Sequence, residues 1–323
     1  MKIVLTGAFG IDTILRYNQE KTQPQSAFEG YFPFWQVLPE AQLIPFRADQ
    51  VDPEAVLLVI NLNKKTWDEI EPVFDRFKKH ILIQFEARVG WELAYEKAAR
   101  FDYFMSFDRD QSAHPGFRQM YIPYDPAIAS SGRDKRGLYA VINQWKSSRK
   151  MFIDNYLLRF LPRKKKCALI ATLNPNAHYQ IRKEIADRWV EEVDVFGGGW
   201  PKSMANYRGF VSSKVDLLRR YRFCLVMENQ RQNGYITEKL FDCLPAGTVP
   251  IYWGAPDIHE YPGLEWVTSI EGTECDLDKL INDSGLYYRA KKQMAANQKK
   301  ILDTFSIDKF ISTICDILLE CKQ

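Results

Sequence analysis

Short apolar segments alternate with longer helix-like segments along both halves of this 323-residue chain, and this alternation is the strongest constraint on its fold. The strands expected in the first half are Lys2–Leu5, Ala55–Leu62, Ile81–Phe85 and Tyr103–Phe107. Those expected in the second half are Cys167–Thr172, Val193–Phe196, Phe223–Met227 and Thr248–Trp253. Nearly continuous apolar strands separated by helices indicate parallel sheets covered by helices. We therefore expect an α/β protein.

The helical segments and a change of character near the middle of the chain suggest two domains. The expected helices are Thr66–Lys79, Trp91–Ala99, Ala140–Leu161, Tyr179–Val190, Lys214–Tyr221, Thr237–Leu244 and a series from about Asp276 to the end. The segment Ser130–Arg136 is polar and rich in turn formers, and the basic run Arg163–Lys166 reads as a linker or strand lead-in. We place a first Rossmann-like domain at residues 1–150 and a second at 151–323 with the C-terminal helices, close to the usual domain size of ~150 residues.

Composition excludes several classes of protein. Hydrophobic residues make up 46% of the chain and the net charge is +3, which excludes a disordered chain and a polycation that binds nucleic acid mainly by charge. The first residues read as a strand rather than a signal peptide, and no apolar run is long enough to span a bilayer. The six cysteines are scattered without a Cys-x-x-Cys pair. We expect a reduced, cytoplasmic protein.

A strand, a polar loop and a helix follow one another in the segment Phe223–Gly254. The strand brings Asn229 to its carboxyl end, and the Thr237 hydroxyl is suited to cap the helix, which Pro245 should end. Backbone amides and a helix N-terminus that point to one place favour an anion such as a pyrophosphate. Lys239 lies in the first turn, where the helix dipole disfavours a cation. A bound anion explains this lysine well, although Thr-Glu-Lys taken alone is more typical of a structural cap.

The same segment resembles the signature of the α-1,3/1,4-fucosyltransferases, and the bacterial members in particular. The matching positions are Glu228-Asn229, Gly234-Tyr235-Ile236-Thr237-Glu238-Lys239-Leu240, Ala246-Gly247-Thr248-Val249-Pro250 and Trp253-Gly254. The resemblance implies an inverting glycosyltransferase that moves L-fucose from GDP-β-L-fucose to a glycan hydroxyl in α-1,3 or α-1,4 linkage. It also implies a GT-B fold, in which two Rossmann-like domains with parallel sheets face a central cleft, with the acceptor mostly on the first domain and the donor in the second.

A second block supports the donor site. Thr172–Ala177, followed by Arg182, resembles the family's Asn-Pro segment and the helix that carries a donor-binding arginine. The guanidinium of Arg182 offers a planar fork for phosphate oxygens. The turn Gly197–Gly199 also has a counterpart in the family and provides backbone freedom. The residues that we assign to donor binding are Asn174, Arg182, Asn229, Tyr235, Thr237, Glu238 and Lys239, with Tyr207 and Val211 added for the guanine pocket.

Inverting transfer needs a base, a stabiliser for the sugar cation and positive groups for the leaving GDP. In the family, a glutamate after a strand of the first domain acts as the general base, and Ile83-Gln84-Phe85-Glu86 places Glu86 at the matching position. Glu92 and Glu96 are alternatives within an expected helix. Glu238 would stabilise the oxocarbenium-like transition state or hold fucose hydroxyls. Arg182, Lys239 and Asn229 would stabilise the departing GDP.

We expect no metal and no cofactor besides the donor. The donor domain contains no Asp-x-Asp after a strand, and we interpret Asp108-Arg109-Asp110 in the first domain as a solvated loop. Three other functions stay open. The turn Thr6–Gly10 is typical of dinucleotide enzymes but lacks a complete Gly-x-Gly-x-x-Gly. A transferase for another GDP-sugar, and a non-catalytic nucleotide-sugar or glycan-binding protein, are the remaining two.

The acceptor stays open among a cell-surface polysaccharide or lipopolysaccharide, a lipid-linked oligosaccharide and a Lewis-type N-acetyllactosamine. The expected partners are GDP-fucose and a glycan, without nucleic acid. The amphipathic segment Ile301–Leu319 is expected to pack on the domains. Contact with the inner membrane surface is the less favoured interpretation of that segment and of the basic run Arg163–Lys166.

Overall fold

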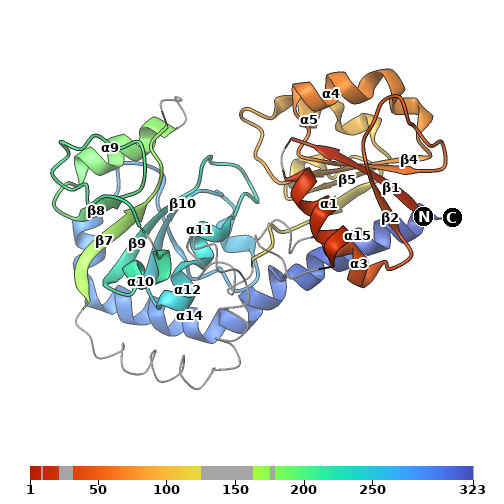
Figure 1. The fold of residues 1–323 in the computed structure, drawn as a ribbon. Helices are drawn as coiled ribbons and strands as arrows, with labels where there is room; N and C mark the ends of the chain where they lie inside the picture. The colour runs from red at the N-terminus through yellow and green to blue at the C-terminus, as the bar shows by residue number, and fades with distance from the viewer. Residues whose placement is uncertain (9, 22–31, 125–162, 175–178, 212, 323) are drawn as a thin grey trace. The chain divides into compact units, whose positions relative to one another are not determined.

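The computed structural model describes residues 1–8, 10–21, 32–124, 163–174, 179–211 and 213–322. Two compact units divide the chain, which is coloured by residue number in Figure 1. The first unit contains Met1–Pro123 and Phe305–Gln323, and the second contains Tyr124–Thr304. Each unit is built on a parallel sheet, which confirms the expected α/β class with two parallel-sheet domains.

The sheet of the first unit has six strands among the described residues, in the order β2-β1-β3-β4-β5-β6, and all neighbours are parallel. The strands are β1 (Lys2–Gly7), β2 (Gln42–Pro45), β3 (Val56–Ile60), β4 (Lys79–Gln84), β5 (Tyr103–Ser106) and β6 (Phe117–Gln119). The four predicted strands are present. The prediction misses β2 and β6 because both are short edge strands without a continuous buried run.

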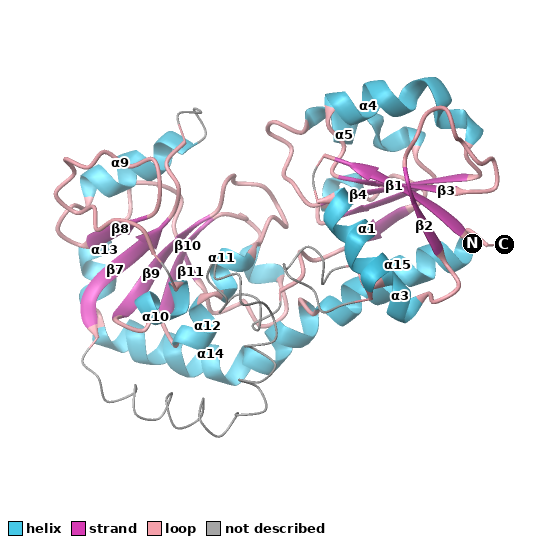
Figure 2. Cartoon of the chain, viewed as in Figure 1, coloured by secondary structure: helices cyan, strands magenta, loops and turns pink. Residues whose placement is uncertain are grey.

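Helices cover both faces of this sheet. The helices are α1 (Ile11–Glu20), α3 (Phe34–Val37), α4 (Lys64–Ile70) and α5 (Glu92–Lys97), with α15 (Ile307–Glu320) and the 3-10 helices η1 (Glu71–Arg76), η2 (Ala98–Arg100) and η3 (Arg109–Gln111). Figure 2 shows α4 and α5 on one face and α1, α3 and α15 on the other. The single helix predicted over Thr66–Lys79 is wrong in its second half, because Pro72 lies at the start of η1 and lacks an amide hydrogen.

The C-terminal helix α15 packs in the first unit, which differs from the expectation that residues 151–323 form one domain. The Phe310 ring lies 5.7 Å from the Phe32 ring and 5.4 Å from the Phe85 ring, measured between centroids. Arg118 forms a 2.8 Å ion pair with Glu320 at the other end of the helix. The apolar face of α15 is clear in the sequence, but the pattern does not say which core receives it. The predicted boundary near residue 150 lies outside the described residues.

The second unit contains a parallel sheet in the order β11-β10-β9-β7-β8, counting the described strands. The strands are β7 (Lys164–Ile170), β8 (Val193–Phe196), β9 (Tyr221–Met227), β10 (Val249–Trp253) and β11 (Thr268–Ser269). All four predicted strands are present. The two-residue edge strand β11 is too short to show a pattern in the sequence.

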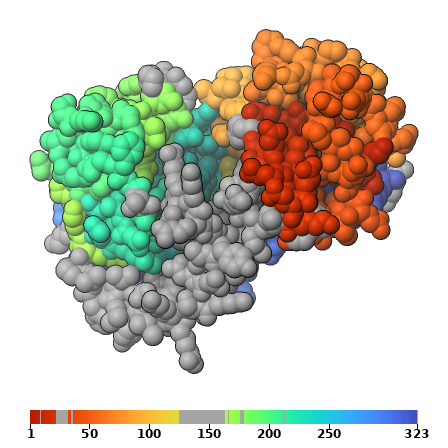
Figure 3. Space-filling view, viewed as in Figure 1, coloured from red at the N-terminus to blue at the C-terminus, as the bar shows by residue number. Residues whose placement is uncertain are grey.

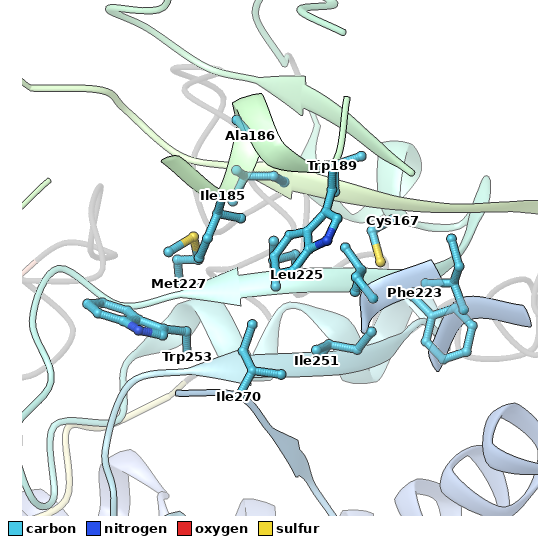
Figure 4. Close-up of a cluster of buried hydrophobic side chains, with 14 of the residues drawn as sticks. Cys167, Ile185, Ala186, Trp189, Phe223, Leu225, Met227, Ile251, Trp253 and Ile270 are labelled. Carbon is cyan, nitrogen blue, oxygen red and sulfur yellow. The ribbon is translucent and has the colours of Figure 1, made fainter. Parts of the chain in front are cut away.

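The helices of the second unit connect these strands and cover the sheet. They are α9 (Gln180–Arg188), α10 (Lys214–Leu218), α11 (Glu238–Phe241), α12 (Cys243–Ala246), η5 (Ile258–Glu260), α13 (Leu277–Asn282) and α14 (Ser284–Thr304). Figure 4 shows Trp189, at the end of α9, close to Leu225 of the sheet, with Ile185 and Ile251 in the same buried cluster. In the space-filling view of Figure 3, residues 179–211, in green, form part of the surface of the second unit. The helix expected at Ala140–Leu161 lies outside the described residues.

The helix predicted over Thr237–Leu244 is two short helices, and the prediction that Pro245 ends it is wrong. α11 stops at Phe241, and α12 contains Pro245 in its third position, where the missing amide hydrogen would have no helical partner. Gly247 ends α12 in the left-handed conformation, with φ of 62°. A four-residue helix has little dipole, so side-chain charges must provide most of the field at its start.

Candidate functional site

A pocket of about 370 Å³ lies at the carboxyl edge of the sheet in the second unit. Its volume is within the usual range of ~300–1,000 Å³ for small-molecule sites. It is lined by Ile170, Ala171, Thr172, Asn174, Tyr179, Arg182, Gly197, Lys214, Asn229, Glu238 and Lys239. These residues follow β7, β8 and β9 or begin the next helices, which is where ligands bind in open parallel sheets.

Five of the predicted donor-site residues line this pocket: Asn174, Arg182, Asn229, Glu238 and Lys239. The other four predicted residues lie outside the lining. Tyr207 packs against the core and donates its hydroxyl to the Gly197 carbonyl at 2.9 Å, and Tyr235 is 3% exposed. Val211 is half-buried, and Thr237 is buried beneath the pocket. The guanine-pocket assignment of Tyr207 and Val211 therefore has no support from the lining.

Glu228 organises the floor below the pocket although its side chain is fully buried. Its Oε1 accepts the Thr237 backbone amide at 2.8 Å, and its Oε2 accepts the Thr237 hydroxyl at 2.6 Å. Lys239 donates to the same Oε2 at 3.2 Å and to the Thr237 hydroxyl at 2.9 Å. The Thr237 hydroxyl also accepts the Lys239 amide, which confirms the predicted helix cap. A buried carboxylate needs such partners because its desolvation is costly.

Arg182 joins the carboxyl ends of β7 and β9. It is 2% exposed, and its NH1 donates to the Thr172 carbonyl at 2.8 Å. Its NH2 donates to the Glu228 carbonyl at 3.1 Å and to Asn229 Oδ1 at 3.0 Å. Its guanidinium carbon lies 4.6 Å from the centre of the Tyr179 ring. Much of the donor capacity of this arginine is therefore used by the protein itself.

Lys214 brings a third positive charge to the pocket. Its Nζ lies 2.8 Å from Oδ2 of Asp242, which is 3% exposed, and 4.0 Å from Oε1 of Glu238. Burial would lower the pKa of Lys214, but the charges of Asp242 and Glu238 outweigh that effect and hold the pKa above its usual value. Burial raises the pKa of Asp242 to about 6, against the opposing effect of Lys214. Lys214 and Lys239 at the pocket are thus each paired with a nearby carboxylate.

Glu238 differs from the other carboxylates because its side chain is 49% exposed. Desolvation acts to raise its pKa, but Lys239 and Lys214 outweigh desolvation and lower it. Its Oε1 lies 3.7 Å from Lys239 Nζ. An ionised, partly exposed carboxylate at the pocket wall is suited to contact sugar hydroxyls or a developing positive charge.

The Gly197–Gly199 turn uses the backbone freedom that was expected of it, and it lies close to the end of β7. Gly197 has φ of 119°, and a Cβ there would lie 2.1 Å from the Ala171 carbonyl oxygen. Gly199 has φ of 79°, and its Cβ would lie 1.9 Å from the Leu173 carbonyl oxygen. Only glycine allows β8 to leave the sheet this close to the end of β7.

Glu86 lies in the first unit at the carboxyl end of β4 and is half-buried. Its backbone carbonyl accepts the Tyr95 hydroxyl at 2.8 Å and Gln84 Nε2 at 3.3 Å. The preceding amide, that of Phe85, donates to Asn61 Oδ1 at 2.8 Å. These bonds hold the backbone around Glu86 in place.

The structure does not favour the two alternatives to Glu86. It also does not favour the rival dinucleotide site. Glu92 and Glu96 are exposed on α5. In the turn after β1, the Ala8 amide donates to the carbonyls of Ile60 and Asn61, so this amide is not presented to a phosphate.

The interpretation of Asp108-Arg109-Asp110 as a solvated loop is wrong for Asp108. This residue is fully buried, accepts Arg88 Nε at 2.8 Å and caps η3 through the Asp110 amide. Spacing alone does not reveal the arginine that makes its burial possible. Among the residues that the structure describes, no group of three or more His, Cys, Asp and Glu side chains could hold a metal ion. No helix in the described part of the chain is long and apolar enough to cross a membrane.

Sequence reasoning gave no individual role to four residues at or below the pocket, although one of them, Glu228, lies within the signature. Lys214 and Tyr179 line the pocket, and Asp242 and Glu228 hold two of its lysines. Glu228 had a usable signal, because it is a carboxylate that ends a fully apolar strand. Lys214 begins the separate helix α10 and offers no such signal.

Residues 160–264 match the model of the C-terminal domain of glycosyltransferase family 10, the fucosyltransferases. The similarity to that family is carried by these 105 of the 323 residues. The matched segment contains the entire pocket lining, whereas Glu86 lies outside it.

Known proteins are similar to parts of this chain. An α-(1,3)-fucosyltransferase FucT of Helicobacter pylori is 37% identical over 97 residues, which are 30% of this chain and 20% of that protein. An α-(1,4)-fucosyltransferase of Arabidopsis thaliana is 43% identical over 44 residues, 14% of this chain and 11% of that protein. The chain thus aligns with a fifth or less of the length of these two relatives.

Solved structures match the fold over nearly the whole chain. A crystal structure of an α1,3-fucosyltransferase with GDP has a TM-score of 0.57 and 19% identity, covering 98% of this chain and 90% of that chain. The structure of Alr3699/HepE of Anabaena with UDP has a TM-score of 0.60 and 10% identity, covering 99% and 100%. Both are GT-B glycosyltransferases, so the chain has the GT-B fold that was expected.

Proposed function

We propose that this protein is an inverting fucosyltransferase that moves L-fucose from GDP-β-L-fucose to a hydroxyl of a glycan, in α-1,3 or α-1,4 linkage. One observation carries the proposal. The pocket at the carboxyl ends of β7, β8 and β9 gathers Arg182, Lys214 and Lys239 within the segment that matches family 10. Three cations around one small pocket suit a diphosphate, and the family match points to GDP-fucose as its source.

The donor side of the reaction requires the diphosphate to leave. As the bond between fucose C1 and the diphosphate oxygen breaks, its electron pair moves to GDP, and nearby ammonium and guanidinium groups stabilise the added charge. The positive charge that develops on the fucose ring faces a carboxylate in the proposed arrangement. Glu238 suits this role because it lines the pocket, is about half exposed and has a lowered pKa.

The acceptor side of the reaction requires a base. We propose Glu86, whose carboxylate would take the proton from the acceptor hydroxyl while that oxygen forms the new bond to C1. Its backbone is fixed by Tyr95 and Gln84 at the end of a buried strand. In this scheme neutralisation of the leaving group comes from protein cations, and no cofactor besides the donor is required.

The acceptor in this proposal is a cell-surface or lipopolysaccharide glycan, met at the cytoplasmic face of the membrane. Only part of the basic run Arg163–Lys166 is suited to contact a membrane surface. Lys164 is exposed, but Arg163 donates to the carbonyls of Ala246, Gly247 and Tyr221 and is a structural residue. Co-sedimentation with vesicles of anionic and of neutral lipid tests this part, and equal binding to both would contradict it.

The experiment that tests the function is an acceptor array incubated with GDP-fucose, read by mass spectrometry for a fucose added to a glycan. Linkage analysis of the product then distinguishes the α-1,3 from the α-1,4 bond and shows whether the anomeric configuration is inverted. Addition of a different sugar from another GDP-sugar, with none from GDP-fucose, would contradict the donor assignment. Binding of GDP-fucose without transfer to any glycan would favour a non-catalytic binding protein.

A further inference from the structure

Asn61 follows β3 at the carboxyl edge of the sheet in the first unit, and its backbone conformation is unusual. Its φ is 54°, in the left-handed region that favours glycine, and the residue is 1% exposed. Lys21, the other non-glycine residue with positive φ in the described part of the chain, ends α1 on the surface. Asn61 is therefore a strained residue in the interior, and such strain persists where other contacts compensate for it.

The side chain of Asn61 makes one such contact and leaves one group without a partner. Its Oδ1 accepts the Phe85 amide at 2.8 Å, beyond the last ladder pair of β3 and β4, which joins Ile60 and Ile83. Its Nδ2 is buried and has no hydrogen-bond partner among the described residues. Glycine would adopt the same backbone conformation without an unpaired Nδ2, but it would lose the bond to Phe85. That bond is what asparagine provides at this position.

Gln84 makes the reciprocal contact from the end of β4, and its side chain is fully buried. Its Oε1 accepts the Leu62 amide at 3.2 Å, and its Nε2 donates to the Glu86 carbonyl at 3.3 Å. Each chain segment thus holds the backbone of the other as the two leave the sheet. The bonds to the Phe85 amide and to the Glu86 carbonyl lie on either side of the Glu86 Cα, so they fix the direction in which its side chain starts.

We propose that Asn61 and Gln84 are positioning residues that aim the Glu86 carboxylate for removal of the proton from the acceptor hydroxyl. Each acts through the backbone of residues 85 and 86 and needs no contact with the substrate. A base must lie within hydrogen-bond reach of the proton that it takes, and a misplacement of about 1 Å can reduce the rate by about 100-fold. The inference rests on the proposed function, in which Glu86 is the base.

A matched pair of asparagine variants tests the proposal. Asn61→Gly removes the bond to the Phe85 amide and keeps a residue suited to positive φ. Asn63→Gly is the control, because Asn63 also accepts one backbone amide at 2.8 Å, that of Thr66, but it caps α4. Turnover is measured as GDP released from GDP-fucose, with N-acetyllactosamine as the acceptor and with water alone. Calorimetry gives the affinity for GDP-fucose, and thermal unfolding shows whether each variant is folded.

We expect Asn61→Gly to lower kcat by about 10- to 100-fold. Its affinity for GDP-fucose should stay near that of the wild type, because the donor pocket belongs to the second unit. Asn63→Gly should change neither quantity, because glycine replaces a helix cap at little cost. Gln84→Met removes the second contact and should also lower kcat, which keeps the proposal testable if Asn61→Gly does not fold. A folded Asn61→Gly or Gln84→Met protein with the kcat of the wild type would overturn the proposal.

The double variant Asn61→Gly, Glu86→Gln separates a positioning role from a general effect on the fold. If Asn61 acts through Glu86, its replacement lowers kcat in the wild type but not in Glu86→Gln, where the base is already lost. Losses of kcat that multiply in the double variant would show that Asn61 acts elsewhere, and they would overturn the proposal.

The single variant Glu86→Gln separates this inference from the proposed function. If the wild-type protein releases no GDP, or if Glu86→Gln turns over as fast as the wild type, the proposed function or its base is wrong, and the positioning role is overturned with it. If Glu86→Gln is slow while Asn61→Gly and Gln84→Met are as fast as the wild type, the base stands and only this inference fails.

Discussion

The Nζ atom of Lys239 lies 3.2 Å from Oε2 of Glu228, a carboxylate with no exposed surface. The pair joins the end of β9 to the first turn of α11, with Thr237 bonded to both residues. The pKa of Lys239 is raised because the charges of Glu238 and Glu228 outweigh the desolvation that would lower it. Lys239 is therefore ionised at neutral pH, and it balances the charge of the buried Glu228 carboxylate.

Removal of this lysine should lower the free energy of unfolding of the protein. Lys239→Met leaves the Glu228 carboxylate buried without its ammonium partner, which is expected to lower the free energy of unfolding by about 3–5 kcal/mol. Urea unfolding measures the change. Lys300→Met is the control, because Lys300 and Glu265 form an exposed pair whose loss should cost less than about 1 kcal/mol. A Lys239→Met protein as stable as the wild type would contradict a stabilising role of the Glu228–Lys239 pair.

The stability of the second unit should depend on the protonation of Asp242. Its folded pKa of about 6 exceeds the ordinary value of 3.8, so the folded state favours the protonated carboxyl. The resulting stabilisation is complete below pH ~4 and is lost as the pH rises through about 6; a shift of about two units corresponds to about 3 kcal/mol. Urea unfolding between pH 4 and 7.5 should show this decrease in the wild type and a flatter profile in Asp242→Asn.

Asp194, in the same unit, should give stability the opposite pH dependence. Burial would raise its pKa, but hydrogen bonds from Tyr221 and Lys164 outweigh burial and lower it. Its contribution to stability is therefore present above the ordinary pKa and lost as the pH falls. The difference between wild type and Asp194→Asn should shrink on acidification. The same sign of pH dependence for Asp194→Asn and Asp242→Asn would contradict this assignment.

Two glycines with positive φ should respond differently to alanine. Gly197→Ala combines backbone strain with a Cβ 2.1 Å from the Ala171 carbonyl oxygen, so it must displace the wall of the pocket. Gly209→Ala has φ of 94° but open space around its Cβ, so it should lose only about 1–3 kcal/mol through strain. We expect Gly197→Ala to lose more stability and also GDP-fucose affinity, as measured by unfolding and calorimetry. Equal losses of stability in both variants would contradict this expectation, because the turn at Gly197 would then accommodate the added methyl group without further cost.

The carboxylate of Glu86 should be needed for turnover and not for donor binding. Glu86→Gln keeps the size of the side chain but cannot take a proton, so kcat should fall by about 10²- to 10⁴-fold. Its affinity for GDP-fucose should stay near that of the wild type. Glu92→Gln is the comparison, because Glu92 is exposed and its carboxylate accepts the Gly90 amide. A loss of turnover in Glu92→Gln instead of Glu86→Gln would transfer the role of base to Glu92.

The sequence predicts the centres of both sheets well because buried parallel strands leave nearly continuous apolar runs. β3 and β9 are examples, and Asn229, which follows β9, lines the pocket at the carboxyl edge of the sheet. The edge strands β2 and β6 escape prediction because half-exposed backbone carries no such run. The position of α15 also escapes prediction, because an amphipathic helix can complete either core.

The sequence predicts those residues of the candidate site that lie close together along the chain. Asn229, Glu238 and Lys239 lie on one strand–loop–helix unit, so a single motif locates them. Lys214 reaches the same pocket from the start of the separate helix α10, and it pairs with Asp242, which lies 28 positions later. Such pairing is a property of packing that local patterns do not record.

The central claim is that the pocket of the second unit binds GDP-fucose as the donor of a transfer reaction. The most direct measurement is GDP release and product formation in the presence of the acceptor array, with GDP-fucose, GDP-mannose, UDP-sugars and CMP-sugars supplied in turn. The account predicts fucosylated product from GDP-fucose and little or none from the other donors. Product from a UDP- or CMP-sugar alone, or no product and no binding with GDP-fucose, would contradict it.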